Sequence, residues 1–281
     1  SDVEERRVSW LRRLLPWLVG LSLGCTGTMD AGGDLPRGLL PVDARNPIVL
    51  CNDGARDNWQ GELALLFSRF GGPKLTGIVV NDSPAWTELA ENLAGWEEMT
   101  AAARQSGFDD VPSPVASRST FKIRPDDGLI ESTAVQDSEG ARFIVDAVRL
   151  HATADRPLVI VTGGRLTEVA DAFLLEPTIA EQVVVVAALG TLTDTGALMD
   201  RPNGEMDHWA NIIVSSRLRY IQVSQYYNQK EDVPEAWLSE LPDTAFGRWI
   251  AAKQATVLKE SLAADQISVL SVAEQEFVTE I

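Results

Sequence analysis

The 281-residue chain has little cysteine and little histidine, only Cys25, Cys51, His151 and His208. Two cysteines cannot build a disulfide scaffold, and two histidines argue against a histidine-rich zinc site or a Ser-His-Asp triad. Basic residues are also scarce, with 24 Lys and Arg against 41 Asp and Glu, which gives a net charge of −17. Because an acidic surface repels phosphate backbones, we expect no nucleic-acid partner, whereas a cation is compatible with this charge.

What the chain does contain is typical of a globular protein. Hydrophobic residues make up 45% and charged residues 23% of the sequence. This balance excludes a wholly disordered, collagen-like or coiled-coil chain. The length allows one large α/β domain or two small ones.

The first residues differ from the rest. Residues 1–24 combine four arginines with an apolar run from Leu14 to Leu23, which is shorter than the roughly 20 residues of a membrane-spanning helix. Because Cys25 and a small, polar stretch follow, the segment resembles a bacterial lipoprotein signal, which implies a lipid anchor at Cys25 and a location in the bacterial cell envelope. The alternatives are an amphipathic first helix and a cytoplasmic protein. We predict a leader at 1–24, a flexible tether at 25–44 and one domain at 45–281.

The body of the chain alternates between two hydrophobic patterns. Short apolar runs predict buried strands at 48–51, 75–80, 158–161, 183–188 and 220–223. Helical spacing predicts helices at 59–70, 84–105, 139–151, 165–175, 207–216, near 233–256 and at 259–272. Residues 107–136 are rich in Pro, Ser, Asp and Gly and predict an irregular, functional flap. The alternation predicts a single-domain α/β fold, with a mostly parallel, Rossmann-like sheet and helices on both faces.

Polar residues follow each predicted strand, where an open α/β sheet binds its ligand. In strand order they are Asn52, Asp53, Asp57 and Asn58, then Asn81 and Asp82, then Thr162, then Glu205 and Asp207, then Tyr226. This set is rich in oxygen, and hard cations such as Ca²⁺ prefer oxygen ligands. Its carboxylates also offer a general base for the activation of water.

The segment from Ile48 to Asn58 resembles the Asp-x-Asp-Pro-Gly-x-Asp-Asp motif of the inosine–uridine preferring nucleoside hydrolase family. Later landmarks follow in order. Residues 158–170 are similar to the family's strand followed by Thr-Gly-Pro-Leu-Thr-Asn, and 183–190 to its next strand. Residues 204–210 are similar to its Glu-Phe-Asn stretch, and 264–270 to its late His-Asp-Pro-Leu-Ala. The resemblance spans about residues 45–275 and implies a nucleoside hydrolase-like fold.

The resemblance also implies a chemistry: Ca²⁺-dependent hydrolysis of the N-glycosidic bond of a nucleoside or a related ribosyl compound. Asp53 would be the base and Asp57 would hold the water or the ribose hydroxyls. The implied metal ligands are Asp53, Asn58, the Thr162 carbonyl and Asp265. The implied substrate contacts are Asp82, Glu205 and Asp207, and Tyr226 would close over a base. The family often forms dimers or tetramers, so a homo-oligomer is expected.

Several positions depart from the family pattern. Asn58 removes a negative charge from the expected metal site, and Cys51 replaces an Asp that supports it. Ala264 stands in place of a His that helps a purine leave. The alternative function is therefore a catalytically lapsed, nucleoside hydrolase-like envelope lipoprotein that binds a sugar-like ligand or a partner.

Each candidate also has a plainer interpretation. Asp53 and Asp57 suit a turn and a helix N-cap, and Thr162 with Gly163 suits an ordinary strand-to-helix turn. Glu205 and Asp207 would add negative charge at a helix start, and Asp265 would be exposed. Cys51 ends an apolar run, so we expect it to be a small core residue.

Overall fold

The computed structural model describes residues 42–54, 68, 72–83, 86–188, 207–223 and 242–252. The chain divides into two units, residues 1–41 and 42–281, and every described residue lies in the second. The predicted leader, most of the tether, and the predicted helices at 59–70 and 259–272 therefore lie outside the described residues, apart from residue 68. None of the described helices is long and apolar enough to cross a lipid bilayer.

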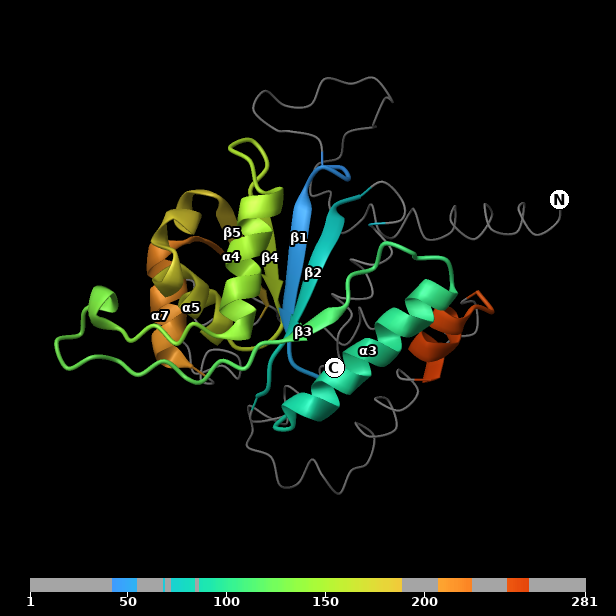
Figure 1. Ribbon diagram of the computed structural model, residues 1–281, viewed down its shortest axis with the longest axis horizontal. Coiled ribbons are helices and arrows are strands. Elements are labelled where there is room, and N and C mark those ends of the chain that lie inside the picture. Colours follow the sequence, from blue (N-terminus) through green and yellow to red (C-terminus); the bar gives the residue numbers. More distant parts are fainter. Residues whose placement is uncertain are drawn as a thin grey trace. The chain divides into compact units, whose positions relative to one another are not determined.

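The described strands form one six-stranded sheet in which every pair of neighbours is parallel. The strand order is β3-β2-β1-β4-β5-β6 (Figure 1). The bounds are β1 Pro47–Asn52, β2 Lys74–Val80, β3 Pro114–Ala116, β4 Leu158–Thr162, β5 Val183–Ala188 and β6 Arg219–Val223. The prediction of an α/β fold with a parallel sheet is confirmed.

The centre of the sheet explains why its strands are continuous apolar runs. Val49, Leu50 and Cys51 of β1 are buried, because β1 lies between two neighbours and under helices on both faces. The chain moves outward from β1 through β2 to β3 and returns to β4 on the other side of β1. The boundary between β1 and β4 is thus the topological switch point, where ligands of such sheets bind.

Helices cover both faces of the sheet. On one face, α4 (Glu139–His151), α5 (Thr167–Leu175) and α7 (His208–Arg217) bury Ile144, Val169 and Ile213 in one core cluster. On the other, α3 (Leu89–Gln105) and the helical residues 245–252 bury a second cluster that includes Trp96 and Phe246. Figure 1 shows α3 apart from the group of α4, α5 and α7.

Four predicted elements differ from the structure by two residues or more. The helix predicted at 165–175 begins at Thr167, and in the helix predicted near 233–256 the described residues 242–244 are not helical. The helix predicted at 84–105 begins at Leu89, because the Trp86 N–H donates to the Ser83 hydroxyl and the two backbones bond each other in a turn. The predicted flap at 107–136 contains β3 and a 3₁₀ turn at Ile130–Ser132. A three-residue strand that begins with Pro114 is too short to show a periodic pattern.

Candidate functional site at the carboxyl ends of the strands

Asp53 lies directly after β1, at the switch point, and is only 3% exposed. The Trp96 indole Nε1–H of α3 donates to the Asp53 carbonyl oxygen at 2.9 Å. The Asp53 carboxylate accepts the Gly54 N–H at 2.8 Å, and the Asn52 amide oxygen accepts the Asp53 N–H at 2.9 Å. Helix α3 and the turn itself therefore hold this carboxylate in one place.

The environment of Asp53 favours its protonated form. Burial raises the pKa of this carboxyl above its usual value, and this outweighs the opposing hydrogen bonds from Ser83 and the Gly54 N–H and the charge of Arg165. A buried carboxylate with a raised pKa at a switch point is a candidate general base.

Glycines allow the strand ends to approach one another closely. A Cβ on Gly54 would lie 2.7 Å from the Trp86 ring, and one on Gly163 would lie 2.6 Å from the Asn52 amide nitrogen. Any side chain at either position would push these groups away from Asp53. The turn after β4 is therefore packed against the end of β1 and is more than a simple connection.

Arg165 joins three strand ends. Its Nη2 donates to the Asp82 carboxylate after β2 at 2.5 Å and to the Ser119 carbonyl after β3 at 2.8 Å. Its guanidinium carbon lies 5.0 Å from the centroid of the Phe121 ring. The Arg165 side chain is buried, whereas that of Asp82 is 37% exposed. Arg165 thus places a fixed positive charge beside the candidate site.

A second buried carboxylate, Glu168, lies in the first turn of α5. Its two oxygens accept hydrogen bonds from the Asn81 amide at 2.9 Å and the Ser117 hydroxyl at 3.4 Å. Burial raises the pKa of Glu168 to about 7, despite the nearby charge of Arg165 and these hydrogen bonds. Burial and contact with Glu168 also raise the pKa of the Cys51 thiol. Cys51 is thus a neutral, buried side chain, as its apolar surroundings predict.

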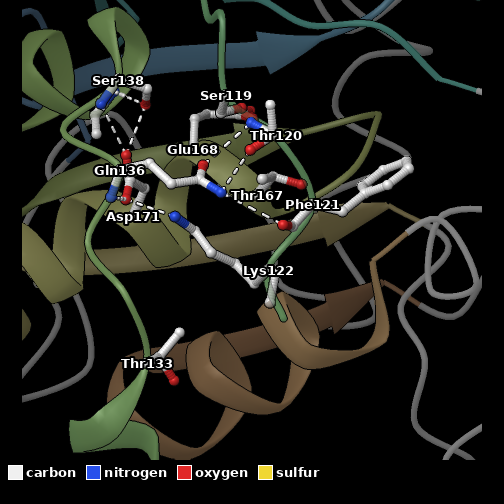
Figure 2. Close-up of polar contacts among 12 residues, drawn as sticks. Ser119, Thr120, Phe121, Lys122, Thr133, Gln136, Ser138, Thr167, Glu168 and Asp171 are labelled. Atoms are coloured by element: carbon white, nitrogen blue, oxygen red, sulfur yellow. Dashed lines mark hydrogen bonds and ion pairs between the residues drawn. The ribbon is translucent and has the colours of Figure 1, made fainter. Parts of the chain in front are cut away.

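The flap that follows β3 is fixed to α5 by Asp171 (Figure 2). The Asp171 carboxylate accepts hydrogen bonds from the Lys122 ammonium at 2.5 Å, the Gln136 N–H at 2.8 Å, and the N–H and hydroxyl of Ser138. The side chains of Lys122 and Asp171 are fully buried. Figure 2 shows Phe121 pointing away from these polar contacts, and the residue is 48% exposed.

Asp207 is the N-cap of α7, and the structure gives both of its oxygens protein partners. One accepts the Ala210 N–H at 3.0 Å, and the other accepts the Lys122 N–H at 2.9 Å and the Thr167 hydroxyl at 2.7 Å. This arrangement matches the plainer interpretation, a carboxylate at a helix start. A contact between Asp207 and substrate stays a prediction.

The structure brings three of the predicted site residues to one edge of the sheet. Asp53 follows β1, Asp82 follows β2 and Thr162 ends β4, where it pairs with Cys51. The predicted residues Asp57, Asn58, Glu205, Tyr226 and Asp265 lie outside the described residues. Within the described ranges, no group of three or more His, Cys, Asp or Glu side chains is arranged to hold a metal ion.

Two residues of this region were not among the sequence candidates. Arg165 and Glu168 fall in the segment 162–168, Thr-Gly-Gly-Arg-Leu-Thr-Glu, where the family pattern has Thr-Gly-Pro-Leu-Thr-Asn. Two charges in a segment that is otherwise apolar or small were the available signal. Their partners come from other strands, so the sequence alone does not name them.

A hollow of about 540 Å³ lies elsewhere, between α3 and residues 245–252. Its lining comes from the second half of α3, including Glu98 and Gln105, and from Ala245, Arg248 and Trp249. The first half of α3 is the part that contacts Asp53 and Asn81. This hollow is therefore separate from the strand-end site.

The link between α3 and Asp53 gives a direct prediction. We expect Trp96→Phe to lower the free energy of unfolding by about 2 kcal/mol, because the buried Asp53 carbonyl loses its donor and a cavity remains. Chemical denaturation checks this value. The matched control is Thr76→Val, which removes a half-buried hydrogen bond to the Ile48 carbonyl at the other end of β1. Only Trp96→Phe is expected to alter the environment of Asp53. An equal loss of unfolding free energy in both variants would contradict this prediction.

Comparison with known proteins gives a likeness of fold. No family model matches the sequence, and no curated protein matches it. Among solved structures, the inosine-uridine preferring nucleoside hydrolase from Bacillus anthracis aligns with a TM-score of 0.54 at 14% identity, over 75% of this chain and 76% of that chain. The effector protein XOO4466 aligns with a TM-score of 0.56 at 18% identity, over 86% and 74%.

A further similar structure is a complex with a ligand. The type III effector protein XopQ, complexed with adenosine diphosphate ribose, aligns with a TM-score of 0.56 at 17% identity, over 85% of this chain and 73% of that chain. At these identities the comparison concerns the fold. The chain has a nucleoside hydrolase-like α/β fold.

Proposed function

We propose that this protein is a hydrolase that cleaves the N-glycosidic bond of a nucleoside or a related ribosyl compound. The observation that carries the proposal is Asp53, a buried carboxylate with a raised pKa at the switch point of a nucleoside hydrolase-like fold. A carboxylate in this position can act as a general base toward a water molecule.

The proposed reaction is a substitution at the anomeric carbon. The oxygen of water bonds to that carbon while the carbon–nitrogen bond breaks, and the electron pair of the broken bond leaves with the nucleobase. Asp53 takes the proton that the attacking water loses. Asp82, which is 37% exposed beside Arg165, would accept a hydrogen bond from a substrate hydroxyl. Glu205 and Tyr226 keep their expected roles as substrate contacts.

The oxygen atoms of the described residues at this site are of the type that a hard cation prefers as ligands. Asp53 and Thr162 offer oxygen atoms at neighbouring strand ends, and the buried Thr162 hydroxyl has no hydrogen-bond partner among the described residues. Asp53, Asn58, the Thr162 carbonyl and Asp265 would hold Ca²⁺. When bound, Ca²⁺ would supply positive charge that polarises water and ribose hydroxyls. Asn58 and the charge of Arg165 on Asp53 are expected to weaken this binding.

The second candidate function is a ligand-binding protein without turnover. It is favoured by Arg165, which already places a positive charge near Asp53, and by Asp207, whose two oxygens both have protein partners. Such a protein would keep the fold and the strand-end site and bind a ribosyl compound without cleaving it.

The deciding experiment incubates the full chain with purine and pyrimidine ribonucleosides in millimolar Ca²⁺ and quantifies free base and ribose by chromatography. Calorimetry measures Ca²⁺ binding separately. We expect equal amounts of base and ribose, and Ca²⁺ binding that is lost in Asp53→Ala but kept in Asp146→Ala, which changes an exposed carboxylate on α4. Nucleoside binding by a folded chain that releases no base would support the second function instead.

A further inference from the structure

One buried carboxylate has no part in the proposed reaction. Glu168 is fully buried, and its partners come from the ends of three neighbouring strands. It bonds Asn81 after β2 and Ser117 after β3, and it contacts the thiol of Cys51 in β1. Burying a charged group is unfavourable unless it is well paired, so a residue in this position calls for an explanation.

Glu168 fixes the orientation of the Asn81 amide. The Asn81 Nδ2 group donates to Glu168 Oε1 at 2.9 Å and to the Arg165 carbonyl at 3.3 Å. Both partners are acceptors, so the NH₂ group of Asn81 must lie on this side. The amide oxygen of Asn81 is left buried, with no donor among the described residues.

The unpaired amide oxygen of Asn81 lies at the candidate site. A Cβ on Gly164 would be 2.8 Å from this oxygen and 3.4 Å from the Asp53 backbone nitrogen. Any side chain at 164 would therefore displace the Asn81 amide, so glycine lets the turn after β4 pack against both Asn81 and Asp53. A buried acceptor without a donor is unfavourable, and a hydroxyl group from a ligand would satisfy it.

We propose that Glu168 is a positioning residue of the strand-end site, whose carboxylate holds Asn81 so that the Asn81 amide oxygen accepts a hydrogen bond from a hydroxyl of the ribosyl ligand. Glu168 itself does not touch the ligand. The inference rests on the proposed function, because it takes the ligand to be a ribosyl compound.

Protonation of Glu168 is expected to change the orientation of the Asn81 amide, and this change can be measured. A neutral carboxyl can donate its proton to the Asn81 oxygen once the amide rotates, and this removes the acceptor from the ligand. Among the residues that the structure describes, the charged or titratable groups that face Glu168 are Cys51 from β1, Arg165 from the β4–α5 turn and Lys122 from the flap. The raised thiol pKa keeps Cys51 neutral. Ligand affinity should therefore fall as the pH is lowered through about 7, the pKa of Glu168.

Two substitutions separate positioning from simple packing. Glu168→Gln keeps an acceptor for Asn81 but cannot titrate, whereas Glu168→Leu fills the space and removes the acceptor. The matched control is Glu139→Gln, which changes a half-exposed carboxylate in the first turn of α4. Thermal melting verifies that each variant of the full chain is folded.

The first measurement is an NMR pH titration of the Asn81 side-chain amide, assigned by its absence in Asn81→Ser. We expect these signals to shift with a midpoint near pH 7 in the wild type and in Glu139→Gln, and to stay constant in Glu168→Gln. This measurement needs no activity. Signals that do not respond to pH in the wild type would overturn the proposal.

The second measurement is KM for inosine between pH 6 and pH 8. At pH 8 we expect KM to rise at least tenfold in Glu168→Leu with kcat changed less than threefold, and to stay near the wild-type value in Glu168→Gln. On lowering the pH, KM should rise in the wild type and not in Glu168→Gln. An unchanged KM in folded Glu168→Leu would overturn the proposal while leaving the hydrolase function intact. Lack of inosine and other nucleoside hydrolysis by the wild type would overturn the hydrolase function, whereas the NMR titration alone decides whether Glu168 controls Asn81.

Discussion

Asp53→Asn is expected to lower kcat for nucleoside hydrolysis by about 10²–10⁴-fold, the usual contribution of a general base. The amide cannot take a proton from water, yet it can still accept the Gly54 N–H that Asp53 accepts now. The loss should therefore be one of chemistry, with the local turn intact. Steady-state rates at saturating nucleoside, measured beside the wild type, check this value.

The same substitution has an expected effect of opposite sign on stability. Burial raises the pKa of Asp53 in the folded chain, so its ionisation costs stability as the pH rises from its unfolded pKa through its folded pKa. Neutral Asn carries no such cost, and Tm above this range should be unchanged or higher. Asp146→Asn, on the exposed face of α4, should change neither rate nor Tm. A marked fall in Tm with activity retained would show that Asp53 serves only the turn.

Lys122→Met is expected to lower the free energy of unfolding by about 3–5 kcal/mol, because it leaves the buried Asp171 carboxylate without its cation. Three hydrogen bonds from Gln136 and Ser138 would remain on Asp171. Chemical denaturation of the full chain measures the effect.

An exposed ion pair serves as the control for Lys122→Met. Arg118→Met removes a cation from the same flap, where Arg118 pairs with Glu139 in solvent, and should cost less than about 1 kcal/mol. The double variant Lys122→Met with Asp171→Leu should recover part of the loss, since no unpaired charge stays buried. Equal costs for Lys122→Met and Arg118→Met would contradict the role given to this pair.

Most of the sheet could be predicted because its central strands are buried on both faces. An uninterrupted apolar run such as 183–188 leaves few alternatives, and its predicted bounds are those of β5. Helix α4 was equally well marked, by Ser138 at its N-cap and a regular apolar face, and its predicted bounds are also those of the structure. Strand β3 could not be predicted, since its three residues carry no pattern and its place depends on pairing with β2.

The candidate site was predictable only in part, for a related reason. Parallel register places the residues that follow β1, β2 and β4 at one edge, so the grouping of Asp53, Asp82 and Thr162 follows from the strand order. The ion pairs of Arg165 with Asp82 and of Lys122 with Asp171 do not follow, because each joins residues far apart in sequence through the path of a loop.

The positions of Cys51 and Glu168 are informative together. The family motif that residues 48–58 resemble has Asp at the position of Cys51, whereas this chain has a neutral thiol there and a buried carboxylate, Glu168, on α5. The structure brings these two side chains into contact. In this chain a buried ionisable group therefore lies beside Cys51, and it is supplied by α5.

The strand order has a consequence for synthesis on the ribosome. Strand β1 takes one neighbour, β2, early, but its other edge waits for β4, and Ile48 pairs with Val159 only after β2, β3 and α4 have been made. Pairing across such a separation is slow, and an uncovered apolar edge is open to aggregation. The nascent chain is therefore most vulnerable to aggregation between the emergence of β1 and that of β4. Slower translation of this interval, or growth of the cells at a lower temperature, should change the yield of soluble protein.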